Sequence, residues 1–79
     1  MKAKIHITLK NGVLDPQGKA IAGALHNLDF KHVNDVRQGK YIELEFSESD
    51  PKKAHASVDS MCQKLLANMV IENYRFEIE

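Results

Sequence analysis

The chain has 79 residues with 11 basic and 11 acidic side chains, so its formal net charge is zero and its length suits one domain, residues 1–79. Balanced charge argues against a nucleic-acid-binding protein, whose affinity comes largely from clustered basic residues. The N-terminal residues show no apolar run, so we expect neither a signal peptide nor a membrane span, and a single cysteine excludes an internal disulfide. We therefore expect a cytoplasmic protein. A domain this small is marginally stable alone, which favours an oligomer.

The first third of the chain predicts a strand, a turn and a helix. Residues 3–9 alternate apolar and polar side chains, as in a half-buried strand. Asn11-Gly12 offers the positive-φ conformations that end a strand, and Asp15-Pro16 supplies a helix cap followed by a helix-starting proline. Apolar residues then recur at spacings of three and four up to about residue 29, which predicts a helix lying on a sheet with a narrow apolar stripe: Ile21, Ala24, Leu25 and Leu28.

Residues 33–46 allow two interpretations. The segment 40–46 is a clear strand pattern, and the segment 33–37 is a shorter and weaker one. Between them, Gln38-Gly39 fits either a tight hairpin turn or a bulge in one long strand. We expect the hairpin, because it makes all neighbouring strands antiparallel.

The last third predicts a second helix and a closing strand. Asp50-Pro51 repeats the cap-and-proline start, and residues 70–79 alternate like a strand. Between them an apolar face, with Leu65 expected in the core, comprises Val58, Met61, Cys62, Leu65, Leu66 and Met69. The order β-α-β-β-α-β predicts an α+β two-layer sandwich, a ferredoxin-like antiparallel sheet with both helices on one face.

This arrangement leaves the other face of the sheet without helices. The pattern places lysines of the first strand beside glutamates of the neighbouring strands on that face. Tyr41 and Ile71 interrupt these charges, so we expect them at the contact between two copies of the chain.

No residue pattern predicts a catalytic or metal site. The four histidines fall on different predicted elements without zinc-ligand spacing, and Cys62 is expected to be buried instead of reactive. The Asp15–Gly18 helix start lacks the spacing of nucleotide-binding loops, although an anion site there stays an alternative. Arg37 and Lys40 flank a predicted turn, where their charges are either solvated or in contact with a partner.

Three blocks of the sequence resemble the PurS family, the small subunits of phosphoribosylformylglycinamidine synthase. The blocks are Thr8–Ile21, Val36–Lys40 and Cys62–Tyr74, and their order and spacing extend nearly end to end. One departure is Met69, where the family usually has proline. Because proline would stop the second helix sharply, its absence leaves the end of that helix less defined.

The resemblance implies a role in the fourth step of purine synthesis. In that step, ATP and glutamine-derived ammonia convert formylglycinamide ribonucleotide to formylglycinamidine ribonucleotide. The resemblance implies that a large synthetase subunit uses the ATP and Mg²⁺, that a separate glutaminase subunit releases the ammonia, and that the small subunit has no catalytic residue or cofactor. It would form a homodimer or higher oligomer and bridge the other two.

Within that role, we expect one group of residues to contact partners instead of supporting the fold. The group comprises Asp15, Pro16, Gln17, Gly18, Arg37, Gly39 and Lys40. The alternative is a stand-alone ferredoxin-like regulatory module that binds a small anionic metabolite at the Asp15–Gly18 helix start.

Overall fold

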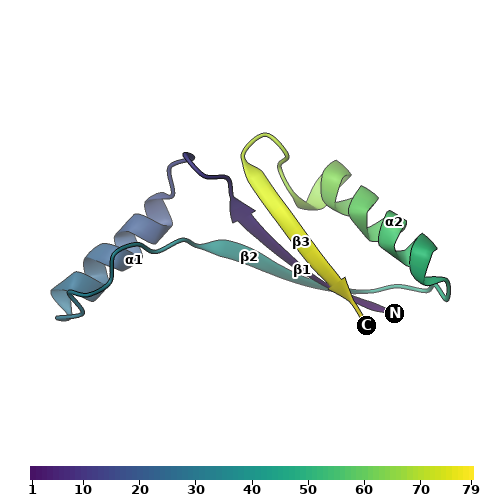
Figure 1. The fold of residues 1–79 in the computed structure, drawn as a ribbon, viewed down its shortest axis with the longest axis horizontal. Helices are drawn as coiled ribbons and strands as arrows, with labels where there is room; N and C mark the ends of the chain where they lie inside the picture. Colours follow the sequence, from purple (N-terminus) through teal and green to yellow (C-terminus); the bar gives the residue numbers. More distant parts are fainter.

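The computed structural model describes all 79 residues and contains one antiparallel sheet with two helices (Figure 1). In chain order the elements are β1 (Lys2–Leu9), α1 (Pro16–Asn27), β2 (Gly39–Glu45), α2 (Pro51–Met61), the π-helical turn η1 (Cys62–Leu66) and β3 (Glu72–Ile78). The sheet has the strand order β2-β1-β3, with β1 antiparallel to both neighbours. The predicted α+β class and ferredoxin-like antiparallel arrangement are confirmed.

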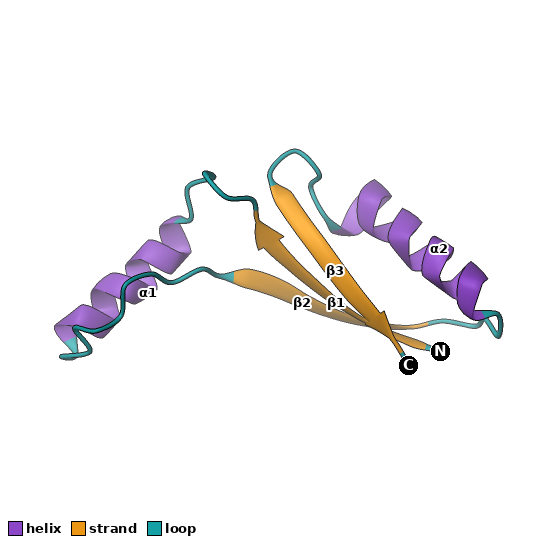
Figure 2. Ribbon diagram, viewed as in Figure 1, coloured by secondary structure: helices purple, strands orange, loops and turns teal.

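The core lies between the sheet and α2 (Figure 2). Every second residue of β1 points to this side, and Ala3, Ile5 and Ile7 are fully buried. From α2 and η1, Val58 and Cys62 pack against them. Because β1 is hydrogen-bonded on both edges and covered on one face, it is the centre of the molecule.

The predicted hairpin at Gln38-Gly39 is wrong, because residues 33–37 form no strand. This segment instead returns alongside α1, and the His26 Nε2 atom lies 2.7 Å from the Val33 carbonyl oxygen. The backbone N–H of Gln38 donates to the Asp15 carboxylate, so it is not free to pair with another strand. The sheet consequently has three strands, and β2 begins at Gly39 opposite Thr8.

Both helices were expected on one face of the sheet, but only α2 lies there. Helix α1 and the return segment extend beyond the end of the sheet, and we call residues 16–38 the α1 arm (Figures 1 and 2). Within α1 only Gly18 is buried and Ile21 is 40% exposed, and Leu28, directly after the helix, is 67% exposed. The chain therefore measures 50 × 24 × 14 Å, and its radius of gyration is 16.1 Å, against about 12 Å for a compact domain of this length.

The expectation that Leu65 belongs to the core is also wrong. At the end of α2 the Ala67 N–H donates to the Cys62 carbonyl at 2.9 Å, which closes a wider, π-type turn. The extra residue in this turn changes the helical phase, so a stripe extrapolated from α2 no longer applies. Leu65 is 82% exposed, whereas Leu66 is partly buried against the core.

Candidate partner-binding site

The site is built around Asp15, the cap of α1, which is only 7% exposed. Its Oδ1 accepts the Gly18 N–H and its Oδ2 accepts the Gln38 N–H, both at 2.8 Å. These two bonds, with the Gln38 bond as the larger cause and the nearby Arg37 guanidinium as a further one, lower the pKa of Asp15. One ionised carboxylate thus joins the start of α1 to the segment that leads into β2.

Arg37 connects the same segment to the end of β1. Its Nη2 atom donates to the Leu9 carbonyl at 2.9 Å and to the Lys10 carbonyl at 3.2 Å, and its Nε lies 3.8 Å from Asp15 Oδ2. We expected Arg37 to contact a partner and to take no part in the fold. These contacts show that it does take part in the fold, so that part of the expectation is wrong, and the partner contact stays a prediction. Arg37 helps to hold the α1 arm on the sheet.

Two glycines allow the backbones to cross closely at this place. A Cβ atom on Gly18 would lie 2.3 Å from the Val36 carbonyl oxygen, and one on Gly39 would lie 2.3 Å from the Ile7 carbonyl oxygen. Real Cβ atoms do not approach a carbonyl so closely, so both positions require glycine or a shift of the backbone.

Beside this crossing is a hollow of about 260 Å³, which we call the crossing hollow; its lining is Ile7, Leu9, Asp15, Pro16, Gln17, Gln38, Gly39, Lys40 and Glu72. Lys40 Nζ lies 3.3 Å from Glu72 Oε2. Glu72 Oε1 accepts the Asn68 N–H at 2.7 Å, and this bond, followed by Lys40, lowers the pKa of the nearly buried Glu72. On this side of the hollow the Lys40 ammonium therefore neutralises the Glu72 carboxylate.

The structure brings the seven predicted partner-binding residues together at the crossing. Pro16, Gln17, Gly39 and Lys40 line the crossing hollow with Asp15, while Gly18 and Arg37 adjoin it through their contacts with Asp15 and Val36. Sequence reasoning missed Glu72. Its position shares the inward phase of Tyr74, Phe76 and Ile78 in β3, and a carboxylate in an apolar phase must find a partner.

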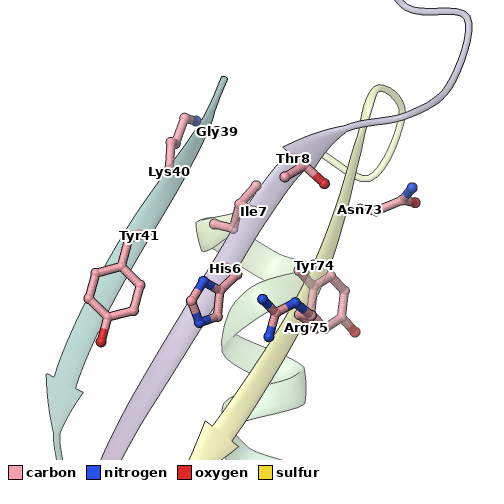
Figure 3. Close-up of a pocket in the computed structure, with 9 residues that line it drawn as sticks. All are labelled: His6, Ile7, Thr8, Gly39, Lys40, Tyr41, Asn73, Tyr74 and Arg75. Carbon is pink, nitrogen blue, oxygen red and sulfur yellow. The ribbon is translucent and has the colours of Figure 1, made fainter. Parts of the chain in front are cut away.

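The two residues predicted for the contact between copies do not lie together. Tyr41 is 51% exposed on the open sheet face, and its ring centroid is 4.9 Å from that of His6 (Figure 3). Ile71 is 37% exposed, and its place in a contact between copies stays a prediction. It lies in the turn before β3, where its carbonyl accepts the Lys10 N–H at 2.8 Å, on the other side of β1 from Tyr41.

The remaining candidate groups are the metal-ligating side chains and the single cysteine. No three histidine, cysteine, aspartate or glutamate side chains are close enough to hold a metal ion. Burial, and to a lesser extent Asp59, raises the pKa of the Cys62 thiol, which makes the thiolate scarce.

Neither helix is long and apolar enough to cross a bilayer.

Comparison with known proteins extends over almost the entire chain. The family model described as PurS, phosphoribosylformylglycinamidine (FGAM) synthase, matches residues 2–79. The PurS subunit of this synthase from Bacillus subtilis is 51% identical over 78 residues, which cover 99% of this chain and 92% of that protein. The subunit from Methanocaldococcus jannaschii is 41% identical, with 99% and 94% covered.

Solved structures give the same result. The structure of Bacillus subtilis PurS superposes with a TM-score of 0.88 at 51% identity and covers 99% of this chain and 96% of its own. A chain in the structure of PurLQS from Thermotoga maritima superposes with a TM-score of 0.87 at 33% identity, with 96% and 93% covered. This chain therefore belongs to the PurS family of phosphoribosylformylglycinamidine synthase subunits.

Proposed function

We propose that this chain is the non-catalytic assembly subunit of phosphoribosylformylglycinamidine synthase, which dimerises and bridges the synthetase and glutaminase subunits to support ammonia transfer. The observation that carries the proposal is the nearly full-length PurS match, joined by the likeness to a chain of PurLQS from Thermotoga maritima. In this role the chain itself needs no cofactor, and ATP and Mg²⁺ are used by the synthetase partner.

The bonding at the crossing supports a structural role over a catalytic one. Asp15 and Glu72 are the least exposed carboxylates, and both are ionised. Asp15 accepts two backbone N–H groups and lies beside Arg37, whereas Glu72 accepts one backbone N–H and lies beside Lys40. A general acid or base needs a pKa near the working pH, but both of these pKa values are lowered. The exposed lining residues that we propose for contact with partners are Pro16 and Gln17, together with Lys40, whose ammonium also pairs with Glu72.

The surface that one copy leaves uncovered supports the proposed homodimer. The accessible area is 5757 Å², roughly 900 Å² more than the ~4,800 Å² expected for a folded monomer of this mass. This excess is close to the ~800 Å² that each partner buries in a standard interface. Exposed apolar side chains along and beside α1, which a second copy would cover, are Leu14, Ile21, Leu28 and Phe30. Tyr41 and Ile71 stay predicted contacts whose role a dimer structure would test.

Reconstitution of the three components tests the bridging role. We expect glutamine-dependent synthesis to require this chain, whereas ammonia-dependent synthesis should fall less on its omission, because free ammonia bypasses the glutaminase. Lys40→Gln, which places no second carboxylate beside Glu72, should weaken co-purification with the two partner subunits, while Lys53→Gln on the exposed surface of α2 should not. Full glutamine-dependent activity without the chain would contradict the proposal.

The alternative of a stand-alone regulator that binds an anionic metabolite finds less support. The Asp15 carboxylate already accepts the N–H of Gly18 at the start of α1, so a second anion there would meet a negative charge. Thermal unfolding separates the two roles. A ligand bound at a hundredfold excess over Kd stabilises by roughly 2.7 kcal/mol, and we expect no such shift with ATP, glutamine or the ribonucleotide.

A further inference from the structure

The turn between β1 and α1 carries the one asparagine–glycine pair of the chain, Asn11-Gly12 (Figure 1). The side-chain carboxamide of an asparagine can be attacked by the backbone nitrogen of the next residue. Glycine hinders this attack least, because it has no Cβ and leaves the backbone free to rotate. The attack gives a cyclic imide, which water opens to aspartate or isoaspartate. The pair is therefore a candidate for covalent modification.

Both residues of the pair are open to solvent. Asn11 and Gly12 are exposed, and neither the Gly12 N–H nor the Asn11 carboxamide makes a hydrogen bond within the chain. A Cβ placed on Gly12 would meet nothing within 4 Å, so no neighbouring group shields its nitrogen. Asn68 differs, because its carboxamide oxygen accepts the Val70 N–H at 3.1 Å. The reacting atoms of the pair are thus held by no contact of their own.

The folded turn nevertheless keeps the two reacting atoms apart. The Val13 N–H donates to the Lys10 carbonyl at 3.1 Å, and Gly12 has a φ of 86° while the φ of Asn11 is negative. These features define a type II turn, in which ψ of the residue at the Asn11 position is about +120°. At that angle the Gly12 nitrogen points away from the Asn11 side chain. The attack therefore requires the turn to open.

Arg37 sets how readily this turn opens. The Lys10 carbonyl that closes the turn also accepts a hydrogen bond from Arg37 Nη2 at 3.2 Å, and the same nitrogen donates to the Leu9 carbonyl at 2.9 Å. The Lys10 N–H donates to the Ile71 carbonyl at 2.8 Å. Lys10 is thus held on both sides, whereas the pair after it is held only by the turn bond. Such a local opening costs less free energy than global unfolding.

We propose that Asn11 is a site of spontaneous deamidation, which takes place when the turn from Lys10 to Val13 opens and which Arg37 slows by holding the Lys10 carbonyl. In the reaction the Gly12 nitrogen forms a bond to Asn11 Cγ, the Cγ–Nδ2 bond breaks, and ammonia leaves with the Gly12 amide proton. Water then adds to one of the two imide carbonyls. The net change consumes one water, releases one ammonia and leaves isoaspartate or aspartate.

The product alters the connection that attaches the α1 arm to the sheet. The turn leads directly to Asp15, whose carboxylate caps α1 and accepts the Gln38 N–H. Isoaspartate adds one atom to the backbone between β1 and Asp15, and both products add a carboxylate beside Lys10. Deamidation therefore changes the length and the charge of this connection at a single residue.

The test incubates the full chain at mildly alkaline pH and follows its peptides by mass spectrometry over time. Deamidation raises the mass of the peptide that contains Asn11, and methylation by a protein isoaspartate methyltransferase identifies isoaspartate in it. The parent is compared with Arg37→Gln, with the milder Arg37→Lys, and with Lys53→Gln, which removes a charge on α2. Asn34, exposed and followed by Asp35, is the internal control. Amide exchange in β1 is recorded in parallel, because it reports opening of the sheet.

We expect deamidation at Asn11 and no comparable rate at Asn34. Loss of a hydrogen bond that holds the turn should speed the Asn11 reaction about fivefold in Arg37→Gln, with Lys53→Gln close to the parent and the β1 amides protected throughout. An intact Asn11 in the folded parent, under conditions in which the urea-unfolded chain deamidates, would overturn the site, as would an equal rate at Asn34.

Two further outcomes would overturn the protection by Arg37. One is an equal rate in the parent and in both Arg37 variants. The other is acceleration only in chains whose β1 amides also exchange rapidly, because the reaction would then come from unfolding of the sheet and not from opening of the turn.

Discussion

Two glycines of α1 face different surroundings, which makes them a matched pair. A Cβ on Gly18 would collide with the Val36 carbonyl, whereas one on Gly23 would meet nothing within 4 Å. We expect Gly18→Ala to lower the free energy of unfolding by about 1–3 kcal/mol through the forced shift. Gly23→Ala should raise it by roughly 0.4–1 kcal/mol, because alanine restricts the unfolded chain and favours helix. Urea unfolding measures both; equal effects would mean that α1 does not meet the return segment as described.

At the same crossing, Asp15 makes stability depend on pH. Its pKa is lower in the folded chain than its ordinary value of 3.8, so its stabilisation is complete above that value and is lost as the pH falls through the folded value. Asp15→Asn, whose amide cannot accept both N–H groups, should lower the melting temperature at neutral pH.

The melting-temperature gap between Asp15→Asn and the parent chain should narrow below about pH 3.8. Asp29→Asn is the control, because Asp29 is exposed and asparagine tolerates its positive φ of 73°. A gap that is the same at pH 3 and pH 7 would show that the Asp15 charge is not what holds the arm.

At the scale of the elements, two residues of the same apolar stripe, Val58 and Leu65, differ in burial because the helix changes at the end of α2. Val58 is fully buried, while the π-type turn leaves Leu65 largely exposed. Val58→Ala should therefore cost about 2–3 kcal/mol of unfolding free energy. Leu65→Ala should change it by less than about 0.5 kcal/mol. If denaturant titration shows that Leu65→Ala lowers the unfolding free energy by more than about 2 kcal/mol, Leu65 is buried as the apolar spacing indicated, and the π-type turn described here is wrong.

Local signals explain which elements could be predicted. Asp15-Pro16 and Asp50-Pro51 begin both helices as expected, because capping is decided within three residues, and the alternation in β1 is confirmed by its burial. The position of α1 beyond the sheet could not be predicted, because an apolar stripe does not say which surface covers it. Likewise, the sequence assigned the residues at the crossing to partner contact, but their bonds within the fold could not be predicted. Asp15 and Arg37 bond to residues more than 20 positions away in the sequence.

At the scale of the whole molecule, the exposed apolar side chains of the α1 arm predict which substitutions would prevent dimerisation. Ile21→Asp places a charge in the apolar stripe of α1 and should convert the dimer to a monomer at micromolar concentration, since burying an unpaired carboxylate is costly. Lys19→Asp introduces the same group on the opposite side of the helix and should leave the dimer intact. Sedimentation velocity distinguishes them. A monomeric parent chain under these conditions would contradict the proposed dimer. A dimeric Ile21→Asp variant would show that the two copies meet at a surface other than α1.

The position of β1 between two strands, and of α1 outside the sheet, also implies two classes of backbone amide. Amides of β1 can exchange with solvent deuterium only when the sheet opens, so they should be protected in a single copy and should gain only the further stabilisation that association gives to the folded chain. Amides of α1 have little tertiary cover within one copy, so their exchange should slow as concentration rises and copies associate. One deuterium-exchange series over concentration would thus measure folding and association in the same sample.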